Sequence, residues 1–300
     1  MTSSYLEANA RERIAQVLDA GSFEEFLPPS KRIVSPHLGQ LDAPVSFDDG
    51  VVVGRGALNG AKVFAVAQEG GFMGGAVGEV HGAKLVGLLK RAVQERAEGI
   101  LLLLETGGVR LHEANAGLIA VSEVMRAVLD TRAAGIPVIV LVGGSNGCFG
   151  GMGIVARCAN AIIMSEEGRL AMSGPEVIET ANGVEEFDSR DRALVWRTTG
   201  GKHRYLLGDC HGIVADDTAA FRTAATQALK AFKNNPTALS LQALEAEQAM
   251  LEQRIARFGD AADPLEIWQR LGIGKPQDIA MLEAAAFTAL AEPHRVKGQA

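Results

Sequence analysis

A dense run of glycine at residues 143–153 constrains the fold of this chain more than any other feature. Six of these eleven residues are glycine. A glycine inside regular structure costs roughly 0.5–1 kcal/mol relative to alanine, so such a run is expected where the backbone turns sharply or approaches another group closely. Residues 136–142, directly before it, form an apolar run that is typical of a strand buried on both faces of a sheet. The glycines therefore predict a tight turn at the end of a buried strand.

The same order of strand, glycine turn and helix occurs three times, after Gln68, Glu105 and Val142. This alternation predicts an α/β fold in which helix N-termini gather near the ends of strands. Asn59-Gly60, between two apolar stretches, is the strongest short signal for a β-hairpin. The expected helices cover residues 4–20, 83–99, 113–133 and 238–257, and the expected strands cover 51–57, 61–68, 100–105, 136–142 and 161–165.

Charge and cysteine content exclude several classes of protein. The net charge is −7, whereas a nucleic-acid binder usually carries a basic stripe, so we expect no nucleic-acid partner. The three cysteines form no C-x-x-C pair, which indicates a reducing cytoplasm without a disulfide framework. No apolar run approaches the roughly 18–20 residues of a membrane span, and the first residues are too polar for a signal peptide. We therefore expect a cytoplasmic protein that does not contact membranes.

The glycine turns allow three interpretations. Unpaired amide groups at a turn can bind a phosphate, but the G-x-x-x-x-G-K-[ST] motif is absent, and a Gly151-x-Gly153-x-x-Ala156 match lacks an acidic partner further on. Two amide groups can instead stabilise a developing oxyanion, where losing one donor typically lowers the rate by ~10²–10³. In the third interpretation the glycines only let helices and strands pack closely.

Four motifs, in order, carry a resemblance to a known family. They are GRGALNGAKVFAVAQEGGFMGGAVGEVHGAKLVGLL, ETGGVRLHEANAG, GGSNGCFGG and SGPEVIE, between about residues 50 and 216. Their order and spacing resemble the carboxyltransferase subunits of acyl-CoA carboxylases. Within that family the chain is most similar to the β subunits of biotin-independent malonate decarboxylases, because of its N-terminal segment, its Glu-Thr-Gly-Gly-Val-Arg motif and its helical C-terminus.

The resemblance implies a fold and an activity. The fold would be crotonase-like, a spiral of ββα units over residues 1–235, with a helical extension over residues 236–300 that packs on the same domain or on a partner subunit. The activity would be decarboxylation of a malonyl thioester to the acetyl thioester and CO₂. The substrate would hang on a phosphopantetheine-type (dephospho-CoA-derived) arm of an acyl carrier protein, with no cofactor or metal bound directly. The partners would be a second crotonase-like γ subunit, the carrier protein and an acyl carrier protein transferase α subunit.

Site residues follow by motif position. The resemblance implies that Gly150 and Gly151 donate amide hydrogens to the thioester oxygen, that Gly107 and Gly108 line the same region, that Gly74 and Gly75 shape the pocket wall, and that Gly147 and Arg110 contact the substrate.

The remaining polar residues leave more than one interpretation open. His81 or His112 could deliver the final proton, although a lone histidine is more often structural. No histidine pattern marks Cys148 as a nucleophile. The basic stretch 190–204 could bind an acidic carrier protein or form an ordinary solvated surface.

Two other functions remain open. The chain could be a carboxyltransferase subunit of a biotin-dependent acyl-CoA carboxylase, or a non-catalytic subunit that docks the carrier.

Overall fold

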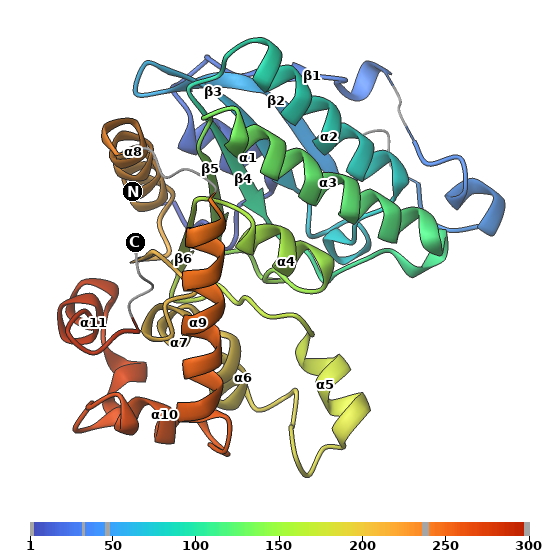
Figure 1. The fold of residues 1–300 in the computed structure, drawn as a ribbon. Helices are drawn as coiled ribbons and strands as arrows, with labels where there is room; N and C mark the ends of the chain where they lie inside the picture. Colours follow the sequence, from blue (N-terminus) through green and yellow to red (C-terminus); the bar gives the residue numbers. More distant parts are fainter. Residues whose placement is uncertain (1–2, 32–33, 46–48, 236–239, 297–300) are drawn as a thin grey trace.

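The computed structural model describes residues 3–31, 34–45, 49–235 and 240–296, and its centre is a seven-stranded sheet (Figure 1). The strands follow one another in sequence order from β1 to β7. They are β1 (Glu24–Phe26), β2 (Val51–Leu58), β3 (Ala61–Gln68), β4 (Gly99–Leu104), β5 (Val138–Val142), β6 (Ala161–Ser165) and β7 (Gly212–Val214). The first three strands pair antiparallel, and β3 through β7 pair parallel.

The hairpin predicted at Asn59-Gly60 is confirmed. β2 and β3 pair from Val51 opposite Gln68 to Leu58 opposite Ala61. Asn59 and Gly60 both have positive φ angles, of 48° and 81°. A turn with two successive residues of positive φ matches the right-handed twist of the strands that it joins. Asn-Gly adopts these φ angles with little strain.

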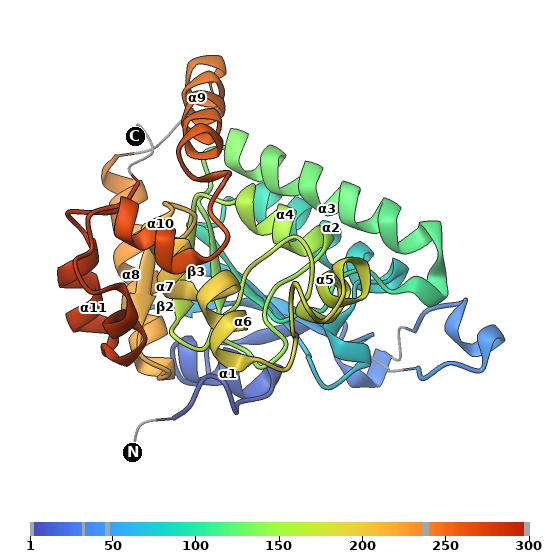
Figure 2. The same cartoon turned by 90° about the horizontal axis from the view of Figure 1, so that it is seen from below.

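Helices cover both faces of the parallel strands. α2 (Glu79–Gln94) and α3 (Asn115–Ala133) lie on one face, and α1 (Ala10–Val17) and α8 (Thr218–Asn234) lie on the other (Figures 1 and 2). Residues of β4 alternate between two hydrophobic cores. Ile100, Leu102 and Leu104 belong to the core under α2 and α3, while Leu101 and Leu103 belong to the core under α1 and α8. A strand buried on both sides therefore reads as an unbroken apolar run.

Several helices differ from the sequence-based expectation. α2 covers residues 79–94 rather than 83–99, and Gly99 begins β4. α1 begins at Ala10, because the Asn9 side chain accepts from the amides of Arg11 and Glu12 while the Glu12 side chain accepts from the Asn9 amide. This capping box fixes the start of the helix at residue 10 instead of residue 4. α8 was not expected from the sequence. It begins after Asp217, whose side chain accepts from the Ala220 amide.

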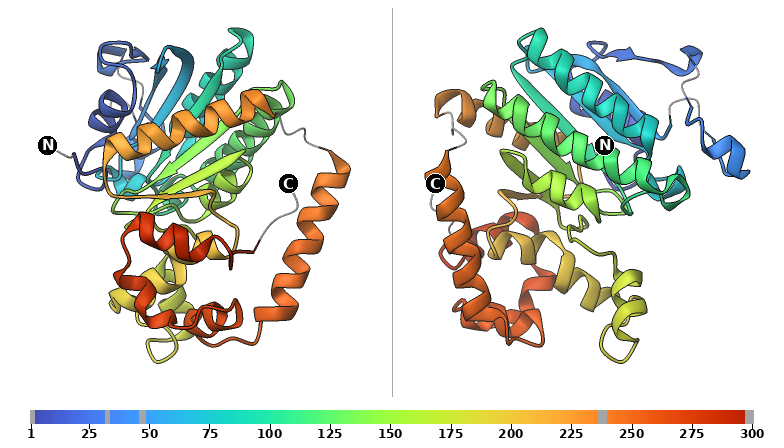
Figure 3. Two further views of the ribbon diagram at one scale, coloured as in Figure 1. Left: turned by 90° about the vertical axis from the view of Figure 1, so that its left-hand side faces the viewer. Right: turned by 45° about the vertical axis from the view of Figure 1, so that its right-hand side comes forward.

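The C-terminal helices form a layer beside the sheet. α9 (Leu241–Phe258) lies mostly exposed and stands away from the body, whereas α10 (Pro264–Arg270) and α11 (Ala284–Ala291) pack against it (Figure 3). Trp268 and Phe287 join the same core as the strands. The expected domain boundary at 235/236 and residues 238–239 of the expected helix fall at 236–239, outside the described residues, so the division into two parts stays a prediction.

Within those described ranges, every helix is too short or too polar to cross a bilayer.

Two buried histidines make stability depend on pH. Burial is the main cause that lowers the pKa of His81 and of His203 to about 3. A histidine whose folded pKa lies below its unfolded value of about 6.5 stabilises the fold above that pH, and this stabilisation is lost as the pH falls. The loss is roughly 1 kcal/mol per pH unit for each histidine.

We therefore expect the Tm to fall as the pH is lowered from about 7 to about 5. His203→Gln should lessen this slope, because glutamine keeps an acceptor for the Trp268 indole, which lies 3.0 Å from His203 Nδ1, and does not titrate. Differential scanning fluorimetry across the range measures both slopes. A Tm that does not change with pH, or an identical slope in the variant, would contradict the expectation.

Candidate active site

Three backbone turns meet at the edge of the sheet where the parallel strands end. The first contains the 3₁₀ helix η3 (Met73–Gly75) after β3, the second follows β4, and the third follows β5. The Gly107 amide donates to Gly74 O at 2.8 Å, the Thr106 amide donates to Gly147 O at 2.8 Å, and the Phe149 amide donates to Thr106 O at 2.9 Å. The structure thus brings the predicted glycine turns into direct contact.

Gly150 lies where the second and third turns touch. Its φ is +63°, and a Cβ placed on it would lie 2.8 Å from the Gly108 Cα. Any side chain here would push the two turns apart, so glycine is required by both conformation and space. This contact supports the close-packing interpretation for Gly150, and it also brings the turn after β4 next to the start of α4 (Gly151–Arg157).

The amide hydrogens around this junction divide into paired and unpaired groups. The Gly150 amide, expected to bind a thioester oxygen, donates to Met172 O at 2.9 Å. The Gly108 amide donates to Thr106 Oγ1 at 3.0 Å. Among the residues that the structure describes, the amides of Gly151 and Val109 have no hydrogen-bond partner. A Cβ on Gly150 would lie 3.7 Å from the Val109 nitrogen, so the Val109 amide borders the junction.

Gly75 and Gly147 support the turns from inside. A Cβ on Gly75 would lie 1.9 Å from Glu105 O, so this glycine packs against the end of β4. At Gly147 a Cβ would lie 2.9 Å from Arg169 O. Both surroundings consist of protein atoms, and the substrate contacts assigned to these two residues stay predictions.

The Arg110 side chain is buried and bonds to groups of the protein itself. It is 1% exposed, and its Nη1 lies 2.9 Å from Asp49 Oδ1 and 3.4 Å from Glu113 Oε2. Nη2 donates to Ala76 O at 3.1 Å. Burial raises the pKa of Asp49, and the charge of Arg110 opposes that rise. The guanidinium thus balances buried carboxylates beneath the turns, and the substrate contact expected for it stays a prediction.

His81 is fixed as a neutral ring in the same network. Its Nδ1 lies 3.1 Å from Asp49 O, and its Nε2 lies 3.1 Å from Gln68 Nε2. Gln68 Oε1 accepts from the Glu105 amide at 3.1 Å, so the Gln68 nitrogen must donate to His81 and Nδ1 must carry the hydrogen. Burial lowers the pKa of His81 to about 3, so near neutral pH the ring is not an imidazolium and lacks the second proton that a general acid would donate. His112 is exposed on the 3₁₀ helix η4 (Leu111–Glu113).

Cys148 is buried within the third turn. Burial raises the pKa of its thiol to about 12, so the nucleophilic thiolate is scarce at neutral pH. This agrees with the view that Cys148 is not a nucleophile.

Several basic residues of the stretch 190–204 form ion pairs and hydrogen bonds within the protein. Arg197 pairs with Asp263, and Arg204 pairs with Asp209. Lys202 donates to the carbonyl oxygens of Ile279, Ala280 and Leu282. The contacts of Arg197 and Lys202 tie the C-terminal layer to the body, whereas Arg190 and Arg192 remain exposed.

Sequence analysis missed two polar residues at the ends of strands, Gln68 and Glu105. Both are buried, with exposed fractions of 0% and 4%. The available signal was a polar residue that ends an apolar run directly before a turn, which is where parallel strands gather functional groups.

Comparison with known proteins agrees with this architecture. The family model for the carboxyl transferase domain matches residues 7–253. The malonyl-S-ACP:biotin-protein carboxyltransferase MADC of Malonomonas rubra is 40% identical, over 98% of this chain and 96% of that protein. The acetyl-coenzyme A carboxylase carboxyl transferase subunit beta of Fusobacterium nucleatum is 32% identical over 58% of this chain, and the match spans 59% of that subunit.

Solved structures of the same family resemble this chain. A chain of the Pseudomonas malonate decarboxylase hetero-tetramer in complex with malonate has a TM-score of 0.77 and 37% identity, covering 96% of this chain and 97% of the other. The transcarboxylase 12S structure with methylmalonyl-coenzyme A has a TM-score of 0.62 and 26% identity, covering 74% of this chain and 40% of the other. The chain therefore belongs to the carboxyl transferase family, has its crotonase-like fold, and is an enzyme of the carboxyltransferase and carboxy-lyase type.

Proposed function

We propose that this chain is the β subunit of a malonate decarboxylase, which converts a malonyl thioester on an acyl carrier protein into the acetyl thioester and CO₂. The observation that carries the proposal is the coverage of the matches. The two proteins that match nearly end to end are named for malonyl or malonate chemistry. The acetyl-coenzyme A carboxylase and transcarboxylase relatives match over about three quarters of this chain or less.

The unpaired amides suit this reaction. When the bond between the malonyl carboxylate and the α carbon breaks, its electron pair forms an enolate and CO₂ leaves. The negative charge then gathers on the thioester oxygen, where fixed amide hydrogens stabilise it. We assign this role to the amides of Gly151 and Val109, since the Gly150 amide already bonds to Met172 O. A proton delivered to the α carbon completes the acetyl group.

No catalytic base is required to start the decarboxylation. The turns supply backbone groups, and the nearby ionisable side chains of Arg110 and Asp49 are paired with each other. Their arrangement fits a site that orients the substrate and stabilises charge rather than one that abstracts a proton.

The acyl group would arrive on a phosphopantetheine-type, dephospho-CoA-derived arm, and this chain would bind no cofactor of its own. The partners would be a second crotonase-like γ subunit, the acyl carrier protein and the transferase α subunit. The matched Pseudomonas chains come from a hetero-tetramer and a hetero-dimer.

Exposed apolar side chains near the turns support a partner subunit. Leu111 is 85% exposed, Ile119 62% and Met172 71%. Val177 of α5 (Pro175–Asn182) is also exposed, and Figures 1 and 2 place α5 on the same side as the start of α3. A gathering of exposed apolar groups marks a protein interface. We therefore place the γ subunit against this face, which we call the turn-side face.

A biotin-dependent carboxyltransferase is the second candidate, because MADC transfers a carboxyl group to a biotin protein by its name. The two functions differ in where the malonyl carboxyl group goes: it leaves as CO₂ in a decarboxylase and moves to biotin in a carboxyltransferase.

The first test follows the carboxyl carbon. We expect the reconstituted complex, given carrier-bound malonyl labelled in its free carboxylate, to release labelled CO₂ without any biotin protein and with avidin present. Release that requires a biotinylated protein, with label recovered on biotin, would favour the second candidate. Absence of turnover in an assembled complex would favour a docking subunit.

A second test asks whether the Gly151 amide acts on the substrate. Gly151 is the first residue of α4, a position that tolerates proline, so Gly151→Pro removes the amide hydrogen with little effect on the helix. A Cβ there would lie 2.6 Å from Val121 Cγ1, and Gly151→Ala introduces the same contact while keeping the amide. We expect kcat of the proline variant to be ~10²–10³ below that of the alanine variant. Equal rates would show that this amide is not a donor.

A third test concerns the turn-side face. Ile119→Asp should weaken binding of the γ subunit by about 30-fold or more, because a charge would be buried in an apolar contact. Met281→Asp is the matched control, since Met281 is 85% exposed and lies in the C-terminal layer. Isothermal titration calorimetry measures both affinities. If both variants bind equally well, the partner lies elsewhere.

A further inference from the structure

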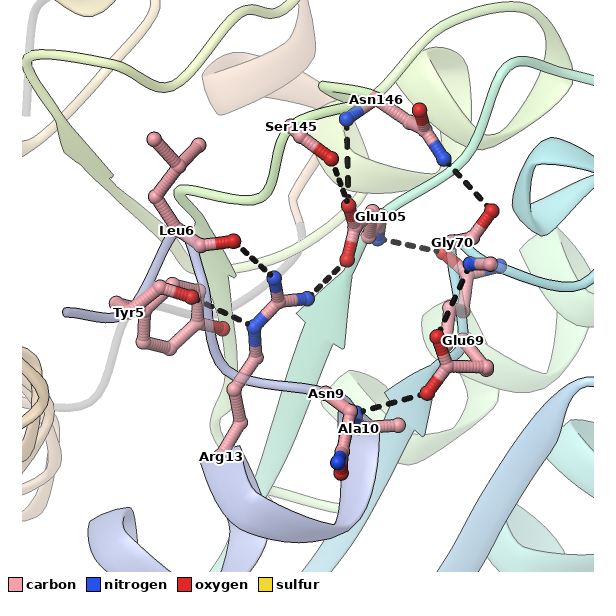
Figure 4. Close-up of polar contacts among 12 residues, drawn as sticks. Tyr5, Leu6, Asn9, Ala10, Arg13, Glu69, Gly70, Glu105, Ser145 and Asn146 are labelled. Atoms are coloured by element: carbon pink, nitrogen blue, oxygen red, sulfur yellow. Dashed lines mark hydrogen bonds and ion pairs between the residues drawn. The ribbon is translucent and has the colours of Figure 1, made fainter.

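A buried ion pair links the N-terminal helix to the edge of the sheet that carries the turns. Arg13 of α1 pairs with Glu105, the residue that follows β4, and the two residues are 1% and 4% exposed (Figure 4). They are 92 positions apart in sequence. Glu105 is the first residue of the Glu-Thr-Gly-Gly-Val-Arg motif, and Arg13 lies outside all four motifs; neither was given a role from the sequence.

Arg13 is held in one orientation. Its Nε donates to Tyr5 O at 2.9 Å and its Nη2 to Leu6 O at 3.2 Å, which leaves Nη1 for Glu105 Oε2. The guanidinium carbon lies 4.8 Å from the centre of the Tyr5 ring. A guanidinium with its donors directed in this way fixes the position of the carboxylate that it contacts.

The other oxygen of Glu105 reaches the turn after β5. Oε1 accepts from Ser145 Oγ at 3.0 Å and from the Asn146 amide at 3.2 Å. The Asn146 side chain continues to the turn after β3, where its Nδ2 donates to Gly70 O at 2.8 Å. One carboxylate therefore connects the ends of β4 and β5, and through Asn146 it also connects to the end of β3 (Figure 4).

Two glycines make room for this carboxylate. A Cβ on Gly144 would lie 2.4 Å from Glu105 Cδ, and a Cβ on Gly70 would lie 2.5 Å from the same atom. Part of the glycine run at 143–153 thus accommodates a buried side chain, not a ligand. Because the backbone must lack side chains on two sides of the Glu105 carboxyl group, these two turns are shaped to accommodate it.

Glu105 and Asn146 lie in the same two turns as the amides assigned to the thioester oxygen. Val109 lies four positions after Glu105, and Gly151 lies five positions after Asn146. The two turns bond directly through Thr106, Gly147 and Phe149, so a shift at Ser145 would pass to both amides.

We propose that Glu105, oriented by Arg13, is a positioning residue that sets the separation of the Val109 and Gly151 amides. This inference rests on the proposed function. Small errors in such a separation are expensive, because a displacement of about 1 Å at a reacting group can lower the rate on the order of 10²-fold.

The test compares two double variants within the assembled complex. Removing only one partner would leave an unpaired buried charge and destabilise the fold, so both are changed together. Arg13→Met with Glu105→Leu removes the ion pair and the acceptor for Ser145 and Asn146. Arg13→Met with Glu105→Gln removes the ion pair but keeps an oxygen acceptor. Asp19→Asn with Arg222→Met is the control, because this ion pair also anchors the N-terminal region but lies away from the turns.

We expect the leucine pair to lower kcat on the order of 10²-fold with little change in KM. The glutamine pair should recover at least about tenfold of that loss, and the control pair should keep the wild-type kcat. Hydrogen exchange of the peptide over residues 143–153, measured without substrate, should speed up in the leucine pair alone. Circular dichroism and Tm show which variants are folded.

A folded leucine pair with wild-type kcat and wild-type exchange would overturn the proposal. Equal loss in the leucine and glutamine pairs would also overturn it, because only the charge would then matter. If the leucine pair does not fold, Ser145→Ala removes one hydrogen bond to Oε1 and should still lower kcat several-fold at constant KM. A failure of the wild-type complex to decarboxylate would count against the proposed function instead, while hydrogen exchange still tests the role of Glu105 in the turns.

Discussion

The parallel pairing of β3, β4 and β5 is the constraint on which the rest of the structure depends. Leu104 pairs with Val142 at the ends of β4 and β5, so the next residues of both strands leave the sheet side by side. Thr106 then bonds to both Gly147 and Phe149, and Gly150 packs on Gly108. Because a Cβ on Gly150 would lie 2.8 Å from the Gly108 Cα, the strand register favours backbone amides over side chains in the proposed site.

A reactive surface made of backbone needs side chains beneath it to hold it in place. Asp49, His81, Arg110 and Glu105 are all buried and hydrogen-bonded to each other or to Gln68. Buried polar groups are usually paired, and a buried hydrogen-bonded network rigidifies its surroundings. These ionisable residues therefore belong to the framework beneath the turns, which suits the proposed site of backbone amides. The N-terminal helix takes part in this framework through Arg13.

The sequence predicted those features that depend on local pattern. Asn59-Gly60 predicted the hairpin, apolar runs predicted β4, β5 and β6, and the glycine turns predicted the edge of the sheet where we place the candidate site. It did not reveal contacts between distant residues. The ion pair of Arg13 and Glu105 joins residues 92 positions apart. The Gly150 amide donates to the carbonyl oxygen of Met172, which lies beyond β6. A motif shows that bare backbone is required, whereas only the fold shows which amides remain unpaired and which glycines make room for a carboxylate.

The central claim is that the amides of Val109 and Gly151 hold the thioester oxygen. A structure of the assembled complex with a stable malonyl-thioester analogue tests it most directly. We expect the analogue's thioester oxygen at about 2.7–3.1 Å from both amide nitrogens. An acyl group bound away from the junction of the two turns, with both amides facing protein or water, would contradict it.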